Sequence, residues 1–369
     1  MLFLTYSTVI SITFFFFLTY VVFLKSLHLY LLPINYATNS QSIKNSFYFI
    51  NNQNIFNNLL TLVTLVWVIV SLVSGPSTSI WFNHLLFSPF QFKMTVVITL
   101  SFMLVSKIIY NNIYFSSKEV YDYIITTLFF MYWIILLFFT NSLFSIMFNI
   151  EVISTLIFTL HITSVFTTSY YYKNVDVSFS YLFQHSTPYS YTKSLLFFYW
   201  ISLITSLNLF LFLILVYLTT FTFDWYLLEY IFNFLLTSSS TNSVLSVGCA
   251  WFIMLICIFT KCGIAPLFIW KPSFFKGLSL HNIFLYITFF YFFLFFYFIN
   301  FLMSSLSSLL YYYGFVLMLF LVIGTVFLIS IIFESVYVKN FLVTSSILNS
   351  ILVLFSVISF SPNSVSFYF

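Results

Sequence analysis

Two ionisable side chains lie inside apolar stretches of the sequence. Glu151 stands in residues 150–156, whose other members are apolar or carry a hydroxyl group, and Lys261 follows directly after the apolar run 251–260. A charge at the centre of a bilayer costs about 2.5–3.5 kcal/mol, so each of these residues requires a reason. Burial disfavours the charged form of lysine and of glutamate, so either group can exchange a proton when its partner moves. The pair therefore predicts proton transfer that needs no cofactor.

A proline follows closely after Lys261. Pro266 has no N–H to donate to the carbonyl of Cys262, and its ring crowds that carbonyl, so we expect the helix to kink or break just past Lys261. Gly263 makes unwinding easier. A lysine beside a broken membrane helix is typical of transporters, in which polar backbone lines a water-filled path. We interpret Glu151 and Lys261 as a candidate proton relay and Pro266 as the helix break.

Each of the ionisable residues also has a simpler interpretation. An isolated membrane glutamate such as Glu151 can be hydrogen-bonded to a neighbouring helix, and Lys261 can extend its ammonium group to an interface. His161 is typical of a histidine that packs between helices. Lys107 and Glu334 fall near the ends of apolar runs, where interfacial positions are expected. The sequence leaves these alternatives open.

The remaining polar residues predict neither a redox centre nor a nucleic-acid surface. The three cysteines lack the paired spacing of zinc or iron–sulfur ligands and are expected to be packing residues: Cys249, Cys257 and Cys262. The six glycines form no G-x-G-x-x-G motif, so no nucleotide site is expected. The basic residues are all lysines, spread thinly, so nucleic acid is not an expected partner. We expect no metal and no cofactor on this chain.

The composition predicts which elements must hold these residues. Only 5% of the residues are charged, 62% are hydrophobic, and the mean hydropathy is +1.10, whereas a soluble domain carries about 25% charged residues. Continuous apolar runs without alternation favour helices over a barrel, so the expected fold is an all-α polytopic membrane protein. About ten spans of membrane-crossing length are expected. They lie near 2–24, 57–74, 94–114, 123–143, 145–168, 194–219, 245–268, 279–302, 308–333 and 341–360.

The chain shows no division into domains. We expect a single transmembrane bundle over 1–369, an extramembrane loop at 35–58, and an interfacial helix followed by a loop at 221–242. The first residues lack a basic region and a cleavage site, so the first apolar run is expected to be a retained helix. The excess of Phe and Tyr over Gly and Ala indicates an A/T-rich genome, as in an organelle.

Three ordered stretches resemble one known family. Residues 261–272, with Gly277 after them, resemble the K-x-G-x-A-P-F-H-x-W-x-P-D-x-x-x-G signature of NADH dehydrogenase subunit 2. Residues 140–152 resemble the family's S-x-N-L-L…L-E-L segment, and Gly324 with 334–347 resembles G…Q-x-x-I-K-R-L-L-A-Y-S-S-I. Three residues depart from the signatures: Phe268 replaces the histidine, Ser273 the acidic residue, and Tyr291 a lysine of the next helix.

The resemblance implies an antiporter-like helix bundle in the membrane arm of respiratory complex I. Glu151 and Lys261 would move protons there, driven by distant redox chemistry. NADH, FMN, iron–sulfur clusters and ubiquinone would belong to partner subunits, so the chain would have no redox site of its own. The expected location is the mitochondrial inner membrane, with lipids and other membrane-arm subunits as partners. The alternatives are a non-conducting scaffold of the same complex and a free-standing cation/proton antiporter.

The family also implies helices beyond this sequence. The segment that resembles 339–347 opens a helix that several more follow in the family, one of which carries a membrane-embedded lysine. Only one span, near 341–360, follows here. The chain therefore resembles a shortened or split subunit. We expect a separate polypeptide to supply the remaining helices and to dock against the spans near 279–360.

Overall fold

The computed structural model describes residues 78–80, 84–112, 119–168, 188–237, 241–278, 280–304, 306–333 and 338–358. They belong to two compact units. Unit 1 comprises Met1–Thr140 and Thr155–Asn174, and unit 2 comprises Asn141–Ser154 and Val175–Phe369. The spans predicted near 2–24 and 57–74 and the loop predicted at 35–58 lie outside the described residues. The single bundle over 1–369 stays a prediction.

Unit 1 contains a hairpin and two paired helices. Its elements are β1 (Thr78–Ile80), β2 (Leu85–Phe87), α3 (Pro89–Asn112), α4 (Glu119–Phe139) and the second part of α5 (Leu143–Thr168). β1 and β2 are antiparallel, and α3 packs on α4. The rings of Phe87, Phe92 and Phe139 contact one another, with centroids 4.8–6.0 Å apart. This aromatic cluster joins the hairpin to both helices.

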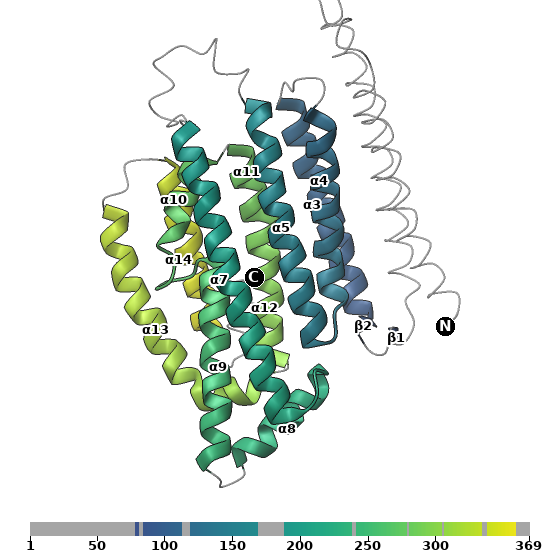
Figure 1. The fold of residues 1–369 in the computed structure, drawn as a ribbon, viewed down its shortest axis with the longest axis vertical. Helices are drawn as coiled ribbons and strands as arrows, with labels where there is room; N and C mark the ends of the chain where they lie inside the picture. The colour runs from purple at the N-terminus through teal and green to yellow at the C-terminus, as the bar shows by residue number, and fades with distance from the viewer. Residues whose placement is uncertain are drawn as a thin grey trace, which may run out of the picture. The chain divides into compact units, whose positions relative to one another are not determined.

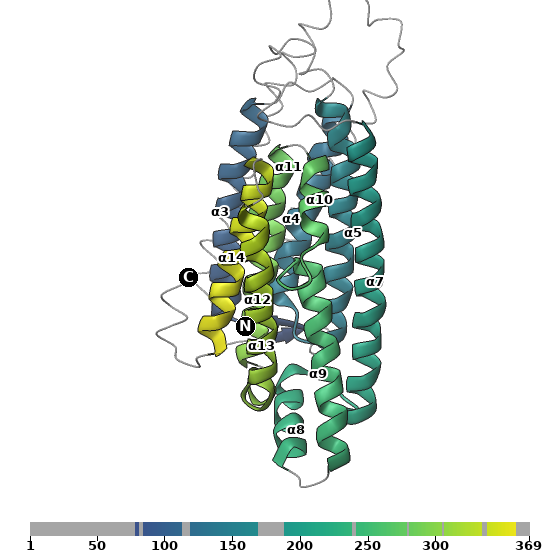
Figure 2. The ribbon, with the colours of Figure 1, turned by 90° about the vertical axis from the view of Figure 1, so that its left-hand side faces the viewer.

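Unit 2 holds the remaining helices and the two ionisable residues predicted to form a relay. Its elements are the first part of α5, α7 (Pro188–Thr220), α8 (Trp225–Thr237), α9 (Thr241–Cys262), α10 (Trp270–Gly277), α11 (Leu280–Leu285), the π-helical turn η3 (Tyr286–Tyr291), α12 (Phe292–Ser304), α13 (Ser307–Phe333) and α14 (Val338–Ile358). α7 and α9 lie side by side, and α13 packs on α14 (Figure 1). α10 continues the line of α9 beyond a non-helical segment and packs on α7 and α14 (Figure 2).

The described part of the chain has six helices long and apolar enough to cross a membrane. They are Leu143–Thr163, Tyr191–Thr220, Val244–Cys262, Asn282–Met303, Ser307–Ile332 and Val338–Ile358. Each overlaps a predicted span, and the chain is an all-α protein of the multi-pass membrane type apart from the short hairpin. The predicted spans near 94–114 and 123–143 are helical, as α3 and α4, but are not among these six.

The region predicted to be interfacial, 221–242, contains the 13-residue helix α8. Its buried side chains are Leu228, Phe232 and Leu236, whereas Tyr230 and Phe234 are exposed. The burial follows the helical period, so one face packs on the unit and the other stays outside. A position at the membrane surface stays a prediction.

Candidate functional site

Glu151 and Lys261 form an ion pair inside unit 2. The Nζ of Lys261 donates a hydrogen bond to Oε1 of Glu151 at 2.6 Å. The Lys261 side chain is 5% exposed and the Glu151 side chain 33% exposed. Ser154 Oγ lies 3.5 Å from Lys261 Nζ and 3.5 Å from Glu151 Oε2. The lysine of the pair is therefore buried, whereas the carboxylate is partly exposed at the surface of the chain.

The first turn of α5 fixes the position of Glu151. Ser142 caps this helix, because its Oγ accepts a hydrogen bond from the Ser145 N–H at 3.3 Å. The N–H of Leu143 donates to the carbonyl of Phe223 at 3.0 Å, in the segment before α8. The start of α5 is thus tied to the segment that connects α7 and α8. Glu151 lies two turns along the helix from this anchor.

The helix that carries Lys261 ends directly after it. α9 stops at Cys262, α10 begins at Trp270, and Pro266 lies in the non-helical segment between them. Gly263 has φ of +62°, a left-handed conformation that favours glycine. The indole Nε1 of Trp270 donates to the carbonyl of Thr260 at 2.9 Å. This bond gives a partner to a carbonyl near the interrupted end of the helix.

The interruption is enclosed by protein. A Cβ on Gly324 of α13 would lie 2.5 Å from Cβ of Ala265 and 2.8 Å from its carbonyl carbon. Only a glycine permits α13 to approach so closely, and Ala265 is fully buried. Irregular backbone at membrane depth is tolerated where protein surrounds it. The match of Gly324 to the family pattern thus has a packing reason that the sequence did not reveal.

An apolar cavity of about 60 Å³ lies beside Lys261. Its walls come from α5, α7, α9 and α12, and include Met147, Phe212, Met254 and Phe298. Cavities with apolar walls stay dry. The hydrogen-bond partners of the Lys261 ammonium among the described residues are Glu151 and Ser154.

A second buried lysine was missed as a candidate by the sequence reasoning. Lys271 of α10 is 0% exposed, and its Nζ lies 3.5 Å from the ring centroid of Tyr291. No hydrogen-bond partner for this Nζ exists among the residues that the structure describes. A lysine between Trp270 and Pro272, close after a predicted break, was the available signal, but it was interpreted only as part of the motif.

Of the other three ionisable residues that the sequence analysis singles out inside or near spans, His161 alone has a described side chain. His161 is 1% exposed and belongs to the part of α5 in unit 1. Lys107 lies in α3, but its side chain and all of Glu334 are outside the described residues. The cysteines are free, and the described residues hold no group of three metal-ligating side chains.

Comparison with known families finds no family model that matches the chain, and comparison with curated proteins finds no significant match. The resemblance to NADH dehydrogenase subunit 2 thus depends on the three sequence stretches alone. The structure itself establishes a helical protein with six candidate membrane spans. Within it, a buried lysine and a glutamate meet where a helix is interrupted.

Proposed function

We propose that the chain is a proton-translocating membrane-arm subunit of NADH:ubiquinone oxidoreductase in the mitochondrial inner membrane. The observation that carries the proposal is the ion pair of Lys261 and Glu151, at 2.6 Å, at the end of an interrupted helix. Ion pairs inside membrane segments are expensive and mark ion and proton paths. The order of the three matched sequence stretches favours this complex over other proton carriers.

The pair supplies a mechanism for moving one proton. While Glu151 contacts the Lys261 ammonium, the opposite charge stabilises the protonated amine. If the end of α9 moves and the two groups separate, the ammonium loses that support and can release its proton. Return of the carboxylate favours uptake of another. Residues 263–269 are the segment in which such a movement would break no regular helical hydrogen bonds.

The energy for this cycle would come from redox chemistry on other chains. NADH, FMN, iron–sulfur clusters and ubiquinone belong to partner subunits in this proposal. The chain itself would have no redox site and would act as an enzyme only as part of the assembly. Coupling would then require that a partner favours one of the two arrangements of the pair.

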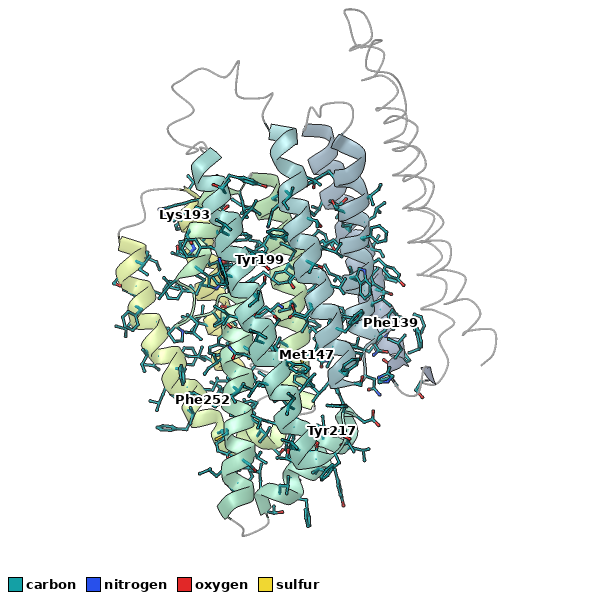
Figure 3. The ribbon with its side chains drawn as sticks, viewed as in Figure 1. Phe139, Met147, Lys193, Tyr199, Tyr217 and Phe252 are labelled. Atoms are coloured by element: carbon teal, nitrogen blue, oxygen red, sulfur yellow. The ribbon has the colours of Figure 1, made fainter. Side chains whose placement is uncertain are left out.

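Exposed apolar faces in unit 2 favour lipids and partner helices as neighbours. Such side chains cover much of α7 and α13, and Tyr199 and Tyr217 of α7 are examples (Figure 3). In a bilayer these faces contact lipid tails or packed helices. The proposal includes a separate chain that docks against α12, α13 and α14 and contributes a membrane-embedded lysine. A structure of the assembly with only lipid along that face would contradict this part.

A non-conducting scaffold of the same complex is the second candidate. Phe268 is 1% exposed at a position where the resemblance implies a histidine, and the phenol of Tyr291 stands where it implies a lysine. Both differences remove proton-accepting groups from the proposed path. A free-standing cation/proton antiporter would share the bundle but not the partners.

Purification from native membranes tests membership of the complex. The chain, carrying an affinity tag, should copurify with NADH-oxidising activity and with FMN. A monomeric chain that exchanges cations for protons in vesicles, without associated NADH oxidation, would establish the antiporter instead. Copurification combined with unchanged proton transport in a Glu151→Gln variant would establish the scaffold.

A further inference from the structure

Lys271 is a buried lysine that the ion pair does not explain. It lies on α10, beyond the interruption that follows Lys261. It is 0% exposed, and within the described part of the chain its Nζ has no hydrogen-bond partner. The face of the Tyr291 ring, 3.5 Å from Nζ, is the contact that offsets the charge. Such a contact stabilises an ammonium by less than its burial costs. A purely structural role would be better served by an apolar side chain.

The fold leaves room for this lysine. A Cβ on Gly263 would lie 2.9 Å from Cδ of Lys271 and 3.4 Å from its Cβ. The glycine at the end of α9 therefore permits the aliphatic stem of Lys271 to pass close to the backbone. The same interruption that frees the end of α9 also admits the second lysine. The two features thus form one local structure.

Two tyrosines contact α10, the helix that carries Lys271. Tyr286 and Tyr291 belong to the π-helical turn η3, and such turns are common at functional sites. The Tyr291 hydroxyl donates to the carbonyl of Ser346 in α14 at 3.2 Å. The Tyr286 hydroxyl is buried without a hydrogen-bond partner in the described part of the chain. Cys262 and Gly263 directly follow Lys261 in the chain; Cys262 is fully buried, and Gly263 lies against the stem of Lys271. The surroundings of the two lysines therefore meet at residues 262–263.

We propose that Lys271 is a second proton-carrying group of the transport path, which follows Lys261 across the helix interruption. This inference rests on the proton-transport function proposed above. In the step, the Lys261 ammonium loses one proton and becomes a neutral amine. The neutral Lys271 amine gains one proton and becomes an ammonium, so one positive charge crosses the interruption without net change. The Tyr291 ring stabilises the Lys271 ammonium, and Lys261 then regains a proton while it contacts Glu151.

The test is the initial rate of proton transport by the purified full assembly in sealed vesicles. Lys271→Met removes the protonatable group and keeps an unbranched apolar stem. We expect the rate to fall about tenfold or more, as for loss of a positioned acid–base group. The thermal midpoint should stay equal or rise, because an apolar side chain replaces a buried amine that has no hydrogen-bond partner in the described residues. Lys276→Met is the matched control, since Lys276 is an exposed residue of the same helix, and it should transport at the unmodified rate.

A relocation variant separates a protonatable role from a structural one. Lys271→Met combined with Tyr291→Lys returns an amine to the same contact from the opposite side, and we expect it to recover most of the lost rate. A folded Lys271→Met assembly that transports normally would overturn the inference. A slow variant that relocation does not rescue would assign Lys271 a structural role. Glu151→Gln, measured in parallel, decides the proposed function separately. If it is slow while Lys271→Met is normal, only the inference about Lys271 fails.

Discussion

The ion pair predicts a specific asymmetry between two single substitutions. At 2.6 Å and an effective dielectric constant of about 20, the attraction between the two charges is about 6 kcal/mol before desolvation is counted. Glu151→Gln leaves a lysine that is 5% exposed without its counter-charge. We expect it to lower the free energy of unfolding by about 3 kcal/mol, since breaking a buried pair costs about 3–5 kcal/mol and glutamine still accepts a hydrogen bond.

Lys261→Met leaves the Glu151 carboxylate without its counter-charge, and the Glu151 side chain is 33% exposed. Because Ser154 Oγ still donates to the remaining carboxylate, at 3.5 Å from Glu151 Oε2, the expected loss is about 1–2 kcal/mol. In the Lys261→Met background the glutamine at position 151 no longer faces a buried cation. There, Glu151→Gln should hardly lower the free energy of unfolding. The double-mutant cycle should therefore give a coupling energy of about 2–3 kcal/mol.

Chemical denaturation in detergent micelles measures these free energies. A matched cycle combines Glu151→Gln with Lys193→Met, where Lys193 is exposed and lies 5.9 Å from the Phe197 ring centroid. The two changes in that control should add to within about 0.5 kcal/mol. If the cycle of Glu151 and Lys261 were equally additive, the two side chains would not be paired in the protein and the argument would be refuted.

Two further substitutions, one of them with a matched control, test the packing of α13 on the helix interruption and the end of α10. Gly324→Ala should cost about 1–3 kcal/mol, because its Cβ would lie 2.5 Å from Cβ of Ala265. Gly314→Ala in the same helix, with nothing within 4 Å of the new Cβ, should instead stabilise by about 0.5–1 kcal/mol. Equal thermal midpoints for the two alanine variants would show that Gly324 is not packed on Ala265. Lys339→Met should cost about 1–2 kcal/mol, because Lys339 Nζ donates to the carbonyl of Leu278, just after α10, at 2.8 Å. An unchanged denaturation midpoint would exclude this capping role.

The sequence predicts most of the helices but not the way they are joined. Long apolar runs indicate the six candidate spans because length and hydropathy are local properties. Pro266 also predicts the break locally, because a proline has no N–H and removes a hydrogen bond from its own helix. The length of the interruption, 263–269, depends on Gly324 and Ala265, which belong to different elements. No local pattern predicts that contact.

Some residues of the candidate site are likewise predictable from the sequence, and others are revealed only by tertiary contacts. The sequence singled out Glu151 and Lys261 because charges inside apolar runs are rare, and the structure brings their side chains together. Lys271 stands between the predicted spans near 245–268 and 279–302, so its position in the sequence predicts no burial. Its burial arises from packing against Tyr291, in the π turn of another helix. The position of Lys339 at the end of α10 is likewise a contact between distant segments, which sequence spacing does not encode.

Proton transport by the assembly with Glu151→Gln tests whether Glu151 belongs to the proton path. The purified complex in sealed vesicles would be supplied with NADH and quinone, and the initial rate of proton uptake would be compared with that of Glu229→Gln. Glu229 accepts a hydrogen bond from Ser307 Oγ at 2.6 Å and lies outside the proposed path. We expect a fully assembled Glu151→Gln complex whose proton transport is at least about tenfold slower, and a Glu229→Gln complex at the unmodified rate. Equal and undiminished proton transport by both variants would contradict the proposed role of Glu151.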